Sequence, residues 1–182
     1  MNFFLHRKKQ IAGGFTILET LIAIAILMTV ITAPLVAANK GLSIALNARD
    51  QLTASLLAQD AAEYVKNLKS VNIATSAPGG WLEGVSGCTV ANLCLLDSTR
   101  PLGSGITQCN SALVDSCPVW LDATGYRQPA PANSSRSAFN RGFYLLEQGG
   151  PDQRKIYVII SWVSGGTRYE STLSAGISNI NW

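Results

Sequence analysis

Residues 15–38 read FTILETLIAIAILMTVITAPLVAA, and this apolar stretch decides how the N-terminal part of the chain folds. Glu19 is its only charged residue, and no charged side chain occurs between Thr20 and Asn39. A bilayer core about 30 Å thick requires roughly 20 helical residues, so the stretch is long enough to span it. Pro34 lies inside the run, where it removes a backbone hydrogen bond and predicts a kinked or loosened helix.

The charges that flank this stretch predict its orientation in a membrane. The chain has 182 residues, is 14% charged and 47% hydrophobic, and carries a formal net charge of +3. Arg7, Lys8 and Lys9 account for the whole positive excess, so this basic end is expected in the cytoplasm. The composition excludes an intrinsically disordered chain and gives no support to nucleic-acid binding through bulk basicity. A secretory signal, the main alternative, has a shorter apolar region followed by a small-residue cleavage site.

The junction before the apolar stretch reads Gly14-Phe15-Thr16-Ile17-Leu18-Glu19. It resembles the leader junction of the type IV prepilin family, which includes minor pilins and the pseudopilins of type II secretion. In that family a short basic leader ends in Gly, a hydrophobic residue follows, usually Phe, and a Glu stands five residues after the cleavage point. The resemblance covers about residues 7–38. It implies that a prepilin peptidase cuts between Gly14 and Phe15 on the cytoplasmic side, and that the new amine of Phe15 is methylated.

Glu19 requires a physical explanation, because a carboxylate inside a spanning helix costs a few kcal/mol and is usually functional. The simplest interpretation places it at the membrane interface, near a helix N-terminus where the macrodipole favours negative charge. The family resemblance implies a second role after cleavage. Glu19 would pair with the Phe15 amine of a neighbouring subunit, or of its own chain, in the apolar core of a filament. The resemblance also implies local melting near Pro34 when subunits join the fibre, and a tolerated kink is the alternative.

Residues 39–75 are predicted to continue the helix as an amphipathic stalk. The apolar residues of its stripe recur at helical spacing and are Leu57, Ala61, Tyr64, Val65 and Leu68. Ala45, Leu46, Leu52 and Leu56 extend this stripe less regularly. No strong helix breaker occurs before residues 76–80, which read SAPGG. We therefore expect one helix from about Thr16 to Ser70, whose second half packs against a globular head formed by residues 76–182.

The head contains the four cysteines of the chain, which are Cys88, Cys94, Cys109 and Cys117, within a loop-rich segment at 76–138. An even number of cysteines outside the cytoplasm predicts disulfides. We favour Cys88–Cys94 with Cys109–Cys117, because the shortest loops close most easily. The pairing of Cys88 with Cys109 and of Cys94 with Cys117 is the main competitor. Free thiols are a further alternative, and a Cys₄ zinc site fits the count but not the spacing.

Residues 139–182 are predicted to form an antiparallel sheet of at least three strands. The first strand runs from Phe139 to Glu147. The second has one apolar face, formed by Ile156, Val158, Ile160 and Trp162, and ends at the two-residue turn Gly165-Gly166. The third alternates over 168–175. A helix packed on such a sheet is an α+β fold. Trp162 in the middle strand is followed by the glycine turn and a final strand. This order resembles that of minor pilins of the pilus-modification type and of I-type pseudopilins, and the resemblance implies a pilin-like head.

Residues that could support catalysis are few. His6 is the only histidine and lies in the leader, so Ser/His or Cys/His catalysis is not expected. No phosphate loop or dinucleotide fingerprint follows a strand, so no cofactor is expected. The loop carboxylates Asp97, Asp115 and Asp122 are scattered. Some pseudopilins bind calcium in such loops, but without an Asp-x-Asp run we expect no metal site here.

Three arginines, Arg127, Arg136 and Arg141, lie near one another in the sequence. Some pilin-like proteins contact DNA during uptake, but the rest of the chain carries no basic stripe. We therefore interpret these arginines as members of a solvated loop and expect no nucleic-acid partner. The neighbouring stretch 128–135, QPAPANSS, is predicted to be an exposed loop by composition.

Together these features predict a minor pilin or pseudopilin without enzymatic activity. Its regions are a cleaved leader at 1–14, a transmembrane and filament-core half-helix at 15–38, the stalk at 39–75 and the head at 76–182. The expected location is the cytoplasmic membrane, crossed once with the N-terminus inside, and then an extracytoplasmic pilus or pseudopilus. The resemblance implies as partners other pilin or pseudopilin subunits, prepilin peptidase, assembly ATPases and a membrane assembly platform. The alternative is a membrane-anchored extracytoplasmic binding or adhesive protein that never enters a filament.

Overall fold

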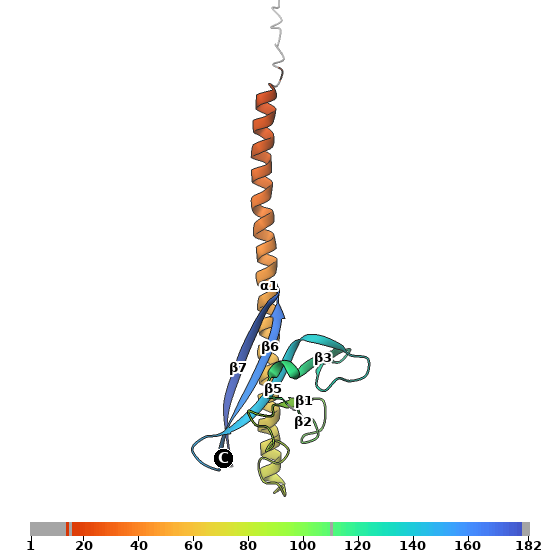
Figure 1. Cartoon of the computed structure of the whole chain (residues 1–182), viewed down its shortest axis with the longest axis vertical. Helices are drawn as coiled ribbons and strands as arrows, with labels where there is room; N and C mark the ends of the chain where they lie inside the picture. The colour runs from red at the N-terminus through yellow and green to blue at the C-terminus, as the bar shows by residue number, and fades with distance from the viewer. Residues whose placement is uncertain (1–13, 15, 110, 180–182) are drawn as a thin grey trace, which may run out of the picture. The chain divides into compact units, whose positions relative to one another are not determined.

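The computed structural model describes residue 14 and residues 16–109 and 111–179. The chain has an α+β architecture, with one long N-terminal helix and a seven-stranded antiparallel sheet (Figure 1). The helix α1 spans Ile17–Ala74 and runs through two compact units, which divide after Ile44. The first unit contributes only helix to the described residues, and the second unit contains the rest of α1 and the whole sheet.

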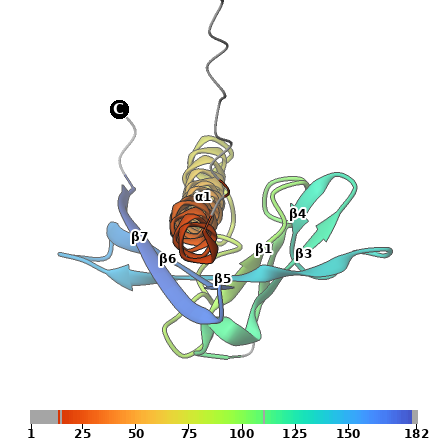
Figure 2. The same cartoon turned by 90° about the horizontal axis from the view of Figure 1, so that it is seen from above.

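The second half of α1 packs on one face of the sheet, as the apolar stripe predicted (Figure 2). Its buried residues are Ala54, Leu57, Ala58, Ala61, Ala62, Tyr64, Val65, Leu68 and Asn72. Four of these are alanines, whose small side chains allow the helix backbone to approach the strands closely. The expectation that Ala45, Leu46, Leu52 and Leu56 extend the stripe is wrong, because all four are exposed. Leu56 stands two residues from both Ala54 and Ala58, and at 3.6 residues per turn this places it on the opposite side of the helix.

The C-terminus of α1 is capped by Ser76, which has the left-handed backbone conformation. Ser76 has a φ of 50°, and its N–H donates to the carbonyl of Ile73 at 3.3 Å. The N–H of Ala77 donates to the carbonyl of Asn72 at 2.9 Å. This pair of bonds is a Schellman motif. The helix continues past the expected end at Ser70, because residues 71–74 contain no breaker and the Asn72 side chain donates to the carbonyls of Trp81 and Glu83.

Three long strands form the main part of the sheet, as predicted. They are β5 (Ser135–Glu147), β6 (Gln153–Ser164) and β7 (Thr167–Ser178). The tight turn between β6 and β7 is also as predicted, because Ser164 pairs with Thr167 and both intervening glycines have positive φ. The apolar face of β6 is buried against α1 through Ile156, Val158, Ile160 and Trp162.

Four short strands extend the sheet into the segment that was expected to be loop. They are β1 (Cys94–Leu96), β2 (Ile106–Gln108), β3 (Pro118–Asp122) and β4 (Gly125–Arg127). One edge of β5 pairs with β6, and its other edge pairs with both β1 and β3. The sheet therefore begins well before residue 139, and β5 itself begins at Ser135. The 3₁₀ helix η1 (Val114–Ser116) contacts β5 and β6.

Candidate functional site

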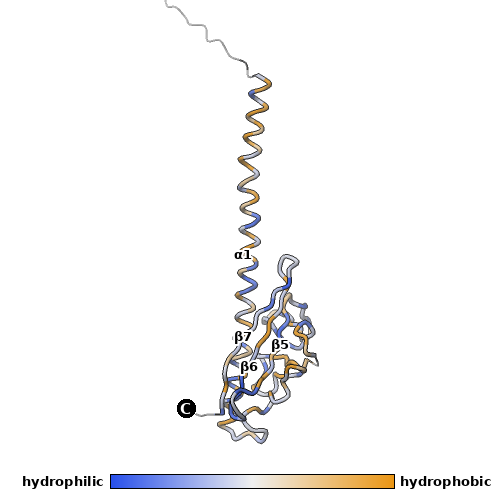
Figure 3. The backbone as a smooth tube through the Cα atoms, turned by 60° about the vertical axis from the view of Figure 1, so that its left-hand side comes forward, coloured by the Kyte–Doolittle hydropathy of each residue, from blue (hydrophilic) through white to orange (hydrophobic). Residues whose placement is uncertain are grey.

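The N-terminal part of α1 has the properties of a membrane-spanning segment. It is long and apolar enough to cross a bilayer, and none of its most apolar window is buried within the chain. Large apolar side chains such as Leu18 and Ile22 are more than half exposed, and hydrophobic residues follow one another along this part of the helix (Figure 3). An exposed apolar surface of this extent requires a membrane or an apolar partner.

Glu19 lies in the first turn of α1, where it completes a helix-capping arrangement. The hydroxyl of Thr16 accepts the backbone N–H of Glu19 at 3.2 Å, and the carbonyl of Thr16 accepts the N–H of Thr20 at 3.2 Å. Thr16 is therefore the N-cap and Glu19 is the third helical residue, where the macrodipole favours a carboxylate. This geometry agrees with the simpler of the two interpretations of Glu19.

The predicted cleavage site is only half described. Gly14 is exposed and precedes the helix, whereas Phe15 and the leader lie outside the described residues. Cleavage, methylation of Phe15 and its pairing with Glu19 therefore stay predictions. Pro34 lies inside α1 with helix on both sides, and because proline has no N–H, the carbonyl of Val30 loses its usual donor. The kink itself also stays a prediction.

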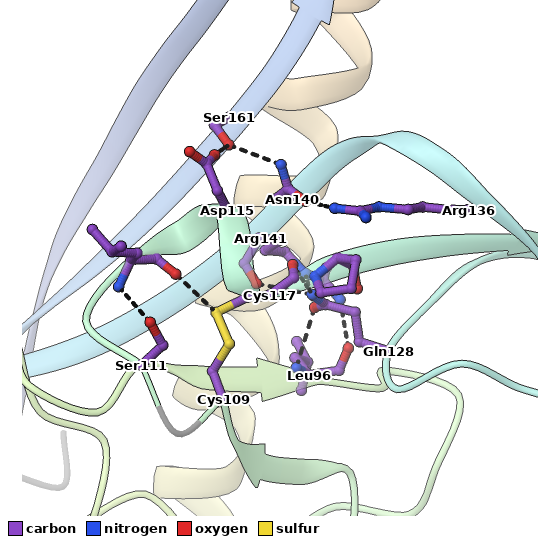
Figure 4. Close-up of a disulfide and its surroundings, with 12 residues drawn as sticks. Leu96, Cys109, Ser111, Asp115, Cys117, Gln128, Arg136, Asn140, Arg141 and Ser161 are labelled. Carbon is purple, nitrogen blue, oxygen red and sulfur yellow. Dashed lines mark hydrogen bonds between the residues drawn. A yellow bond between two sulfur atoms is a disulfide. The ribbon is translucent and has the colours of Figure 1, made fainter.

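Arg141 is not a solvated loop residue, and this interpretation is wrong. It lies on β5 with its side chain 1% exposed, and the alternation of the strand places it on the same face as Phe139 and Phe143. Figure 4 shows it beside Gln128 and Leu96. Its guanidinium donates to the Leu57 carbonyl at 3.2 Å and to Asp60 Oδ2 at 2.9 Å, both on α1. It also donates to the Leu96 carbonyl at 2.6 Å and to Gln128 Oε1 at 3.0 Å. Burial lowers the pKa of Arg141, and the Asp60 carboxylate opposes that change.

Gln128 is the second member of this buried polar cluster. The loop at 128–135 was expected to be exposed, but the Gln128 side chain is fully buried. Its Nε2 donates to the carbonyls of Cys117 and Arg141, both at 2.9 Å. Its Oε1 accepts from Arg141 and, at 3.4 Å, from the N–H of Leu96. Arg141 and Gln128 thus join α1, β1, β5 and the cysteine segment, which makes the cluster an element of the fold rather than a reactive site.

Both predicted disulfides are present in the favoured pairing. Cys88 is bonded to Cys94, and Cys109 is bonded to Cys117. The second bridge lies next to η1, where Asp115 Oδ1 accepts from the Ser161 hydroxyl at 2.7 Å and from the Arg168 guanidinium at 3.2 Å. These hydrogen bonds lower the pKa of Asp115. The contacts attach the disulfide-closed segment to β6 and β7.

The loop carboxylates are engaged separately and do not converge. Asp97 accepts from Thr99 and pairs with Arg100, and Asp122 accepts from Thr124 and pairs with Arg127. Across the described residues, no group of three His, Cys, Asp or Glu side chains is placed to hold a metal ion.

No protein-family model matches the chain, and no curated protein or solved structure does either. Three features of the chain therefore bear on its function: the exposed apolar helix, the junction that precedes it and the disulfide-bonded head.

Proposed function

We propose that the chain is a minor pilin or pseudopilin, a structural subunit of a type IV pilus or a type II secretion pseudopilus. One observation carries the proposal. An exposed apolar helical run begins directly after Gly14-Phe15, and its one charge is Glu19 in the first helical turn. In a simple membrane anchor such a carboxylate carries a desolvation cost of a few kcal/mol, which the macrodipole offsets only in part. In a filament core, the carboxylate has a function as the partner of a free N-terminal amine.

The head supports an extracytoplasmic location. Both disulfides lie in the head, and such bonds persist in oxidising compartments and are rare in the cytoplasm. The three leader cations favour an N-terminus on the cytoplasmic side. The two signals agree, because a single span then places the cysteines across the membrane from Arg7, Lys8 and Lys9.

The proposed mechanism is assembly and not catalysis. Prepilin peptidase removes residues 1–14, and the Phe15 amine becomes a free cation at the end of the apolar helix. Glu19 of one subunit attracts the amine of a neighbour in a medium of low dielectric constant, where an unpaired charge is costly. The apolar helices pack together in the fibre core, the heads face outward, and the assembly platform supplies the subunits.

Cleavage can be tested at the junction itself. We expect the mature protein from producing cells to begin at N-methyl-Phe15 when its N-terminus is analysed by mass spectrometry. Gly14→Val should block processing, because the family motif requires glycine there, and Gly13→Val is the matched control that should still be processed. A mature chain that retains residue 1 in the presence of the peptidase would contradict the proposal.

Glu19→Val tests the assembly step separately. The variant should be cleaved normally but incorporated poorly into sheared filaments or pseudopili, because the Phe15 amine then lacks its partner. Glu63→Gln, on the exposed surface of the same helix, is the control and should assemble normally. Normal incorporation of Glu19→Val would rule out the pairing role.

The alternative is a membrane-anchored binding protein that stays unprocessed. The position of Glu19 is compatible with it, because a carboxylate in the first turn of α1 is stabilised by the macrodipole without cleavage or a neighbour. An intact N-terminus and a purely membrane-bound fraction would identify this alternative.

A further inference from the structure

A pocket with a volume of about 520 Å³ opens at the C-terminal end of α1. It lies wholly within the second unit and is formed by the last turns of the helix and by loop residues 77–78, 83–84 and 102–103. The volume falls within the range of about 300 to 1,000 Å³ that is usual for ligand sites. The pocket has no part in the proposed assembly mechanism, which uses the N-terminal end of the same helix.

The pocket is shaped by two glycines that flank a buried leucine. Leu68 is 3% exposed and forms the base. Gly84 and Gly103 have φ values of +83° and +87°, which residues with a Cβ rarely adopt. A Cβ on Gly84 would lie 3.6 Å from Leu68, and one on Gly103 would lie 3.7 Å from it. The absence of both side chains leaves the space above Leu68 open, with Val71 and Leu102 as apolar walls.

The polar groups of the pocket are suited to a cation. Glu83 is the one charged residue that lines it, and within the described residues it forms no ion pair. Its Oε2 accepts only the N–H of Gly79, at 3.3 Å. The last turn of α1 carries no basic residue, so the negative end of the helix dipole is not neutralised by its own side chains. The side-chain amide of Asn72 donates to the carbonyls of Trp81 and Glu83 and so connects α1 to the loop that carries Glu83.

We propose that this pocket receives a lysine or arginine side chain from a partner protein. Such a side chain has an apolar stem and a cationic head, and it can cover apolar surface while its charge contacts a carboxylate. The stem lies against Leu68, Val71 and Leu102, and the head reaches Glu83 and the carbonyl end of α1. Charge complementarity favours this occupant over a purely apolar one, because the one charged residue among the described residues that line the pocket is the acid Glu83.

The test uses the full-length protein in zwitterionic micelles with labelled Leu and Val methyl groups. Two probes are titrated separately: Nα-acetyl-lysine methylamide, and the norleucine analogue, which has the same stem without the charge. The methyl signals of Leu68 and Leu102 should shift with both probes, and the lysine probe should bind about two- to fivefold more tightly, as expected for a partly exposed ion pair. Equal affinity for the two probes, or no response at about 10 mM, would overturn the proposal.

Two pairs of variants sharpen the result. Glu83→Gln should abolish the preference for lysine while norleucine binding persists, and Glu63→Gln should leave the preference intact. Ala77→Trp should fill the pocket and remove binding of both probes, whereas Ala130→Trp, in an exposed loop, should not. A lysine preference that survives Glu83→Gln would also refute the assignment. None of these outcomes depends on whether Gly14 is cleaved, so failure here and failure of the proposed function are distinguishable.

Discussion

Arg141 is a buried charged residue that connects the helix to several parts of the sheet. It bonds to two atoms of α1, one of β1 and one of Gln128. Desolvating a guanidinium costs several kcal/mol, and this cost is offset only where its donors find well-placed acceptors. Four of its five N–H groups can be assigned to the bonds described here. These bonds therefore fix which residues of α1 lie opposite Arg141, and so set the position of the helix along its own axis relative to β5.

Arg141→Met should destabilise the protein by about 3 to 5 kcal/mol, because the Leu96 carbonyl and Gln128 lose a buried donor. Denaturation of the full-length protein in mild detergent, followed by near-UV circular dichroism, measures the change. Arg49→Met is the matched control, since that side chain is 72% exposed, and it should change the free energy of unfolding by less than about 0.5 kcal/mol. A small effect at Arg141 would mean that the cluster contributes little to stability.

Ser76→Gly should stabilise the protein by up to about 1 kcal/mol. Ser76 occupies the left-handed position after α1, where a Cβ is unfavourable and glycine is not. Ser70→Gly makes the same change inside the helix, where it should cost about 0.5 kcal/mol. The two variants are compared by their midpoints of denaturation, and the same sign at both positions would contradict this account of the helix terminus.

At the scale of elements, the long strands were predictable and the short ones were not. One face of β6 is wholly apolar from Ile156 to Trp162, and the strand ends near a glycine pair, which gives a clear strand signal. β1, β2 and β4 have three residues each, too few to show a period, and each is placed by its partner strands: β1 pairs with β2 and β5, and β4 pairs with β3. The pairings of β1 and β3 with β5 join distant parts of the chain, so local patterns do not reveal them.

The Arg141 cluster was missed although a signal was present. Arg141 falls between Phe139 and Phe143 in the alternation of β5, so the period of two already places it on the buried face. Its closeness in sequence to Arg127 and Arg136 favoured a solvated loop instead, although the alternation of the strand predicts burial. For Gln128 no comparable signal exists, because its loop is rich in proline and polar residues and its partners are set by the tertiary fold.

The attachment of η1 to the sheet should weaken in acid. The pKa of Asp115 is lowered in the folded protein, so the stabilisation is complete above the usual pKa of about 3.9 and is lost as the pH falls through the folded value. The melting temperature should therefore fall more between about pH 5 and pH 2 in the wild type than in Asp115→Asn. Ser161→Ala removes the hydrogen bond that lowers the pKa of Asp115 most, and it should therefore reduce the pH dependence in part. Parallel profiles for wild type and Asp115→Asn would exclude this contribution.

At the scale of the whole molecule, the chain combines two units with different solvent requirements. The buried residues of the described chain lie between Ala54 and Ile177, all in the second unit. The apolar residues of the first unit are exposed and make no contribution to that core. The second unit, which includes the C-terminal part of α1, is therefore expected to fold without the segment that needs a membrane or a fibre.

Residues 45–182, exported to an oxidising compartment, should form a soluble, cooperatively unfolding domain with both disulfides. Circular dichroism and non-reducing peptide mapping check the fold and the pairing. A fragment of residues 45–134, which lacks β5 to β7, is the control and should remain unfolded, because α1 then has no sheet to pack on. Failure of 45–182 to fold would mean that the first unit is needed for the core.

The bond between Arg141 and the Leu57 carbonyl has a consequence for biosynthesis. The two residues are 84 positions apart, and a ribosome adds about 5 to 20 residues per second, so Leu57 is made about 4 to 17 s before its partner. During that interval the long strands β5, β6 and β7 are not yet available to cover the alanine-rich face of the helix. A nascent chain that stalls or terminates before β5 presents this bare face to chaperones and proteases and does not yield a smaller folded head.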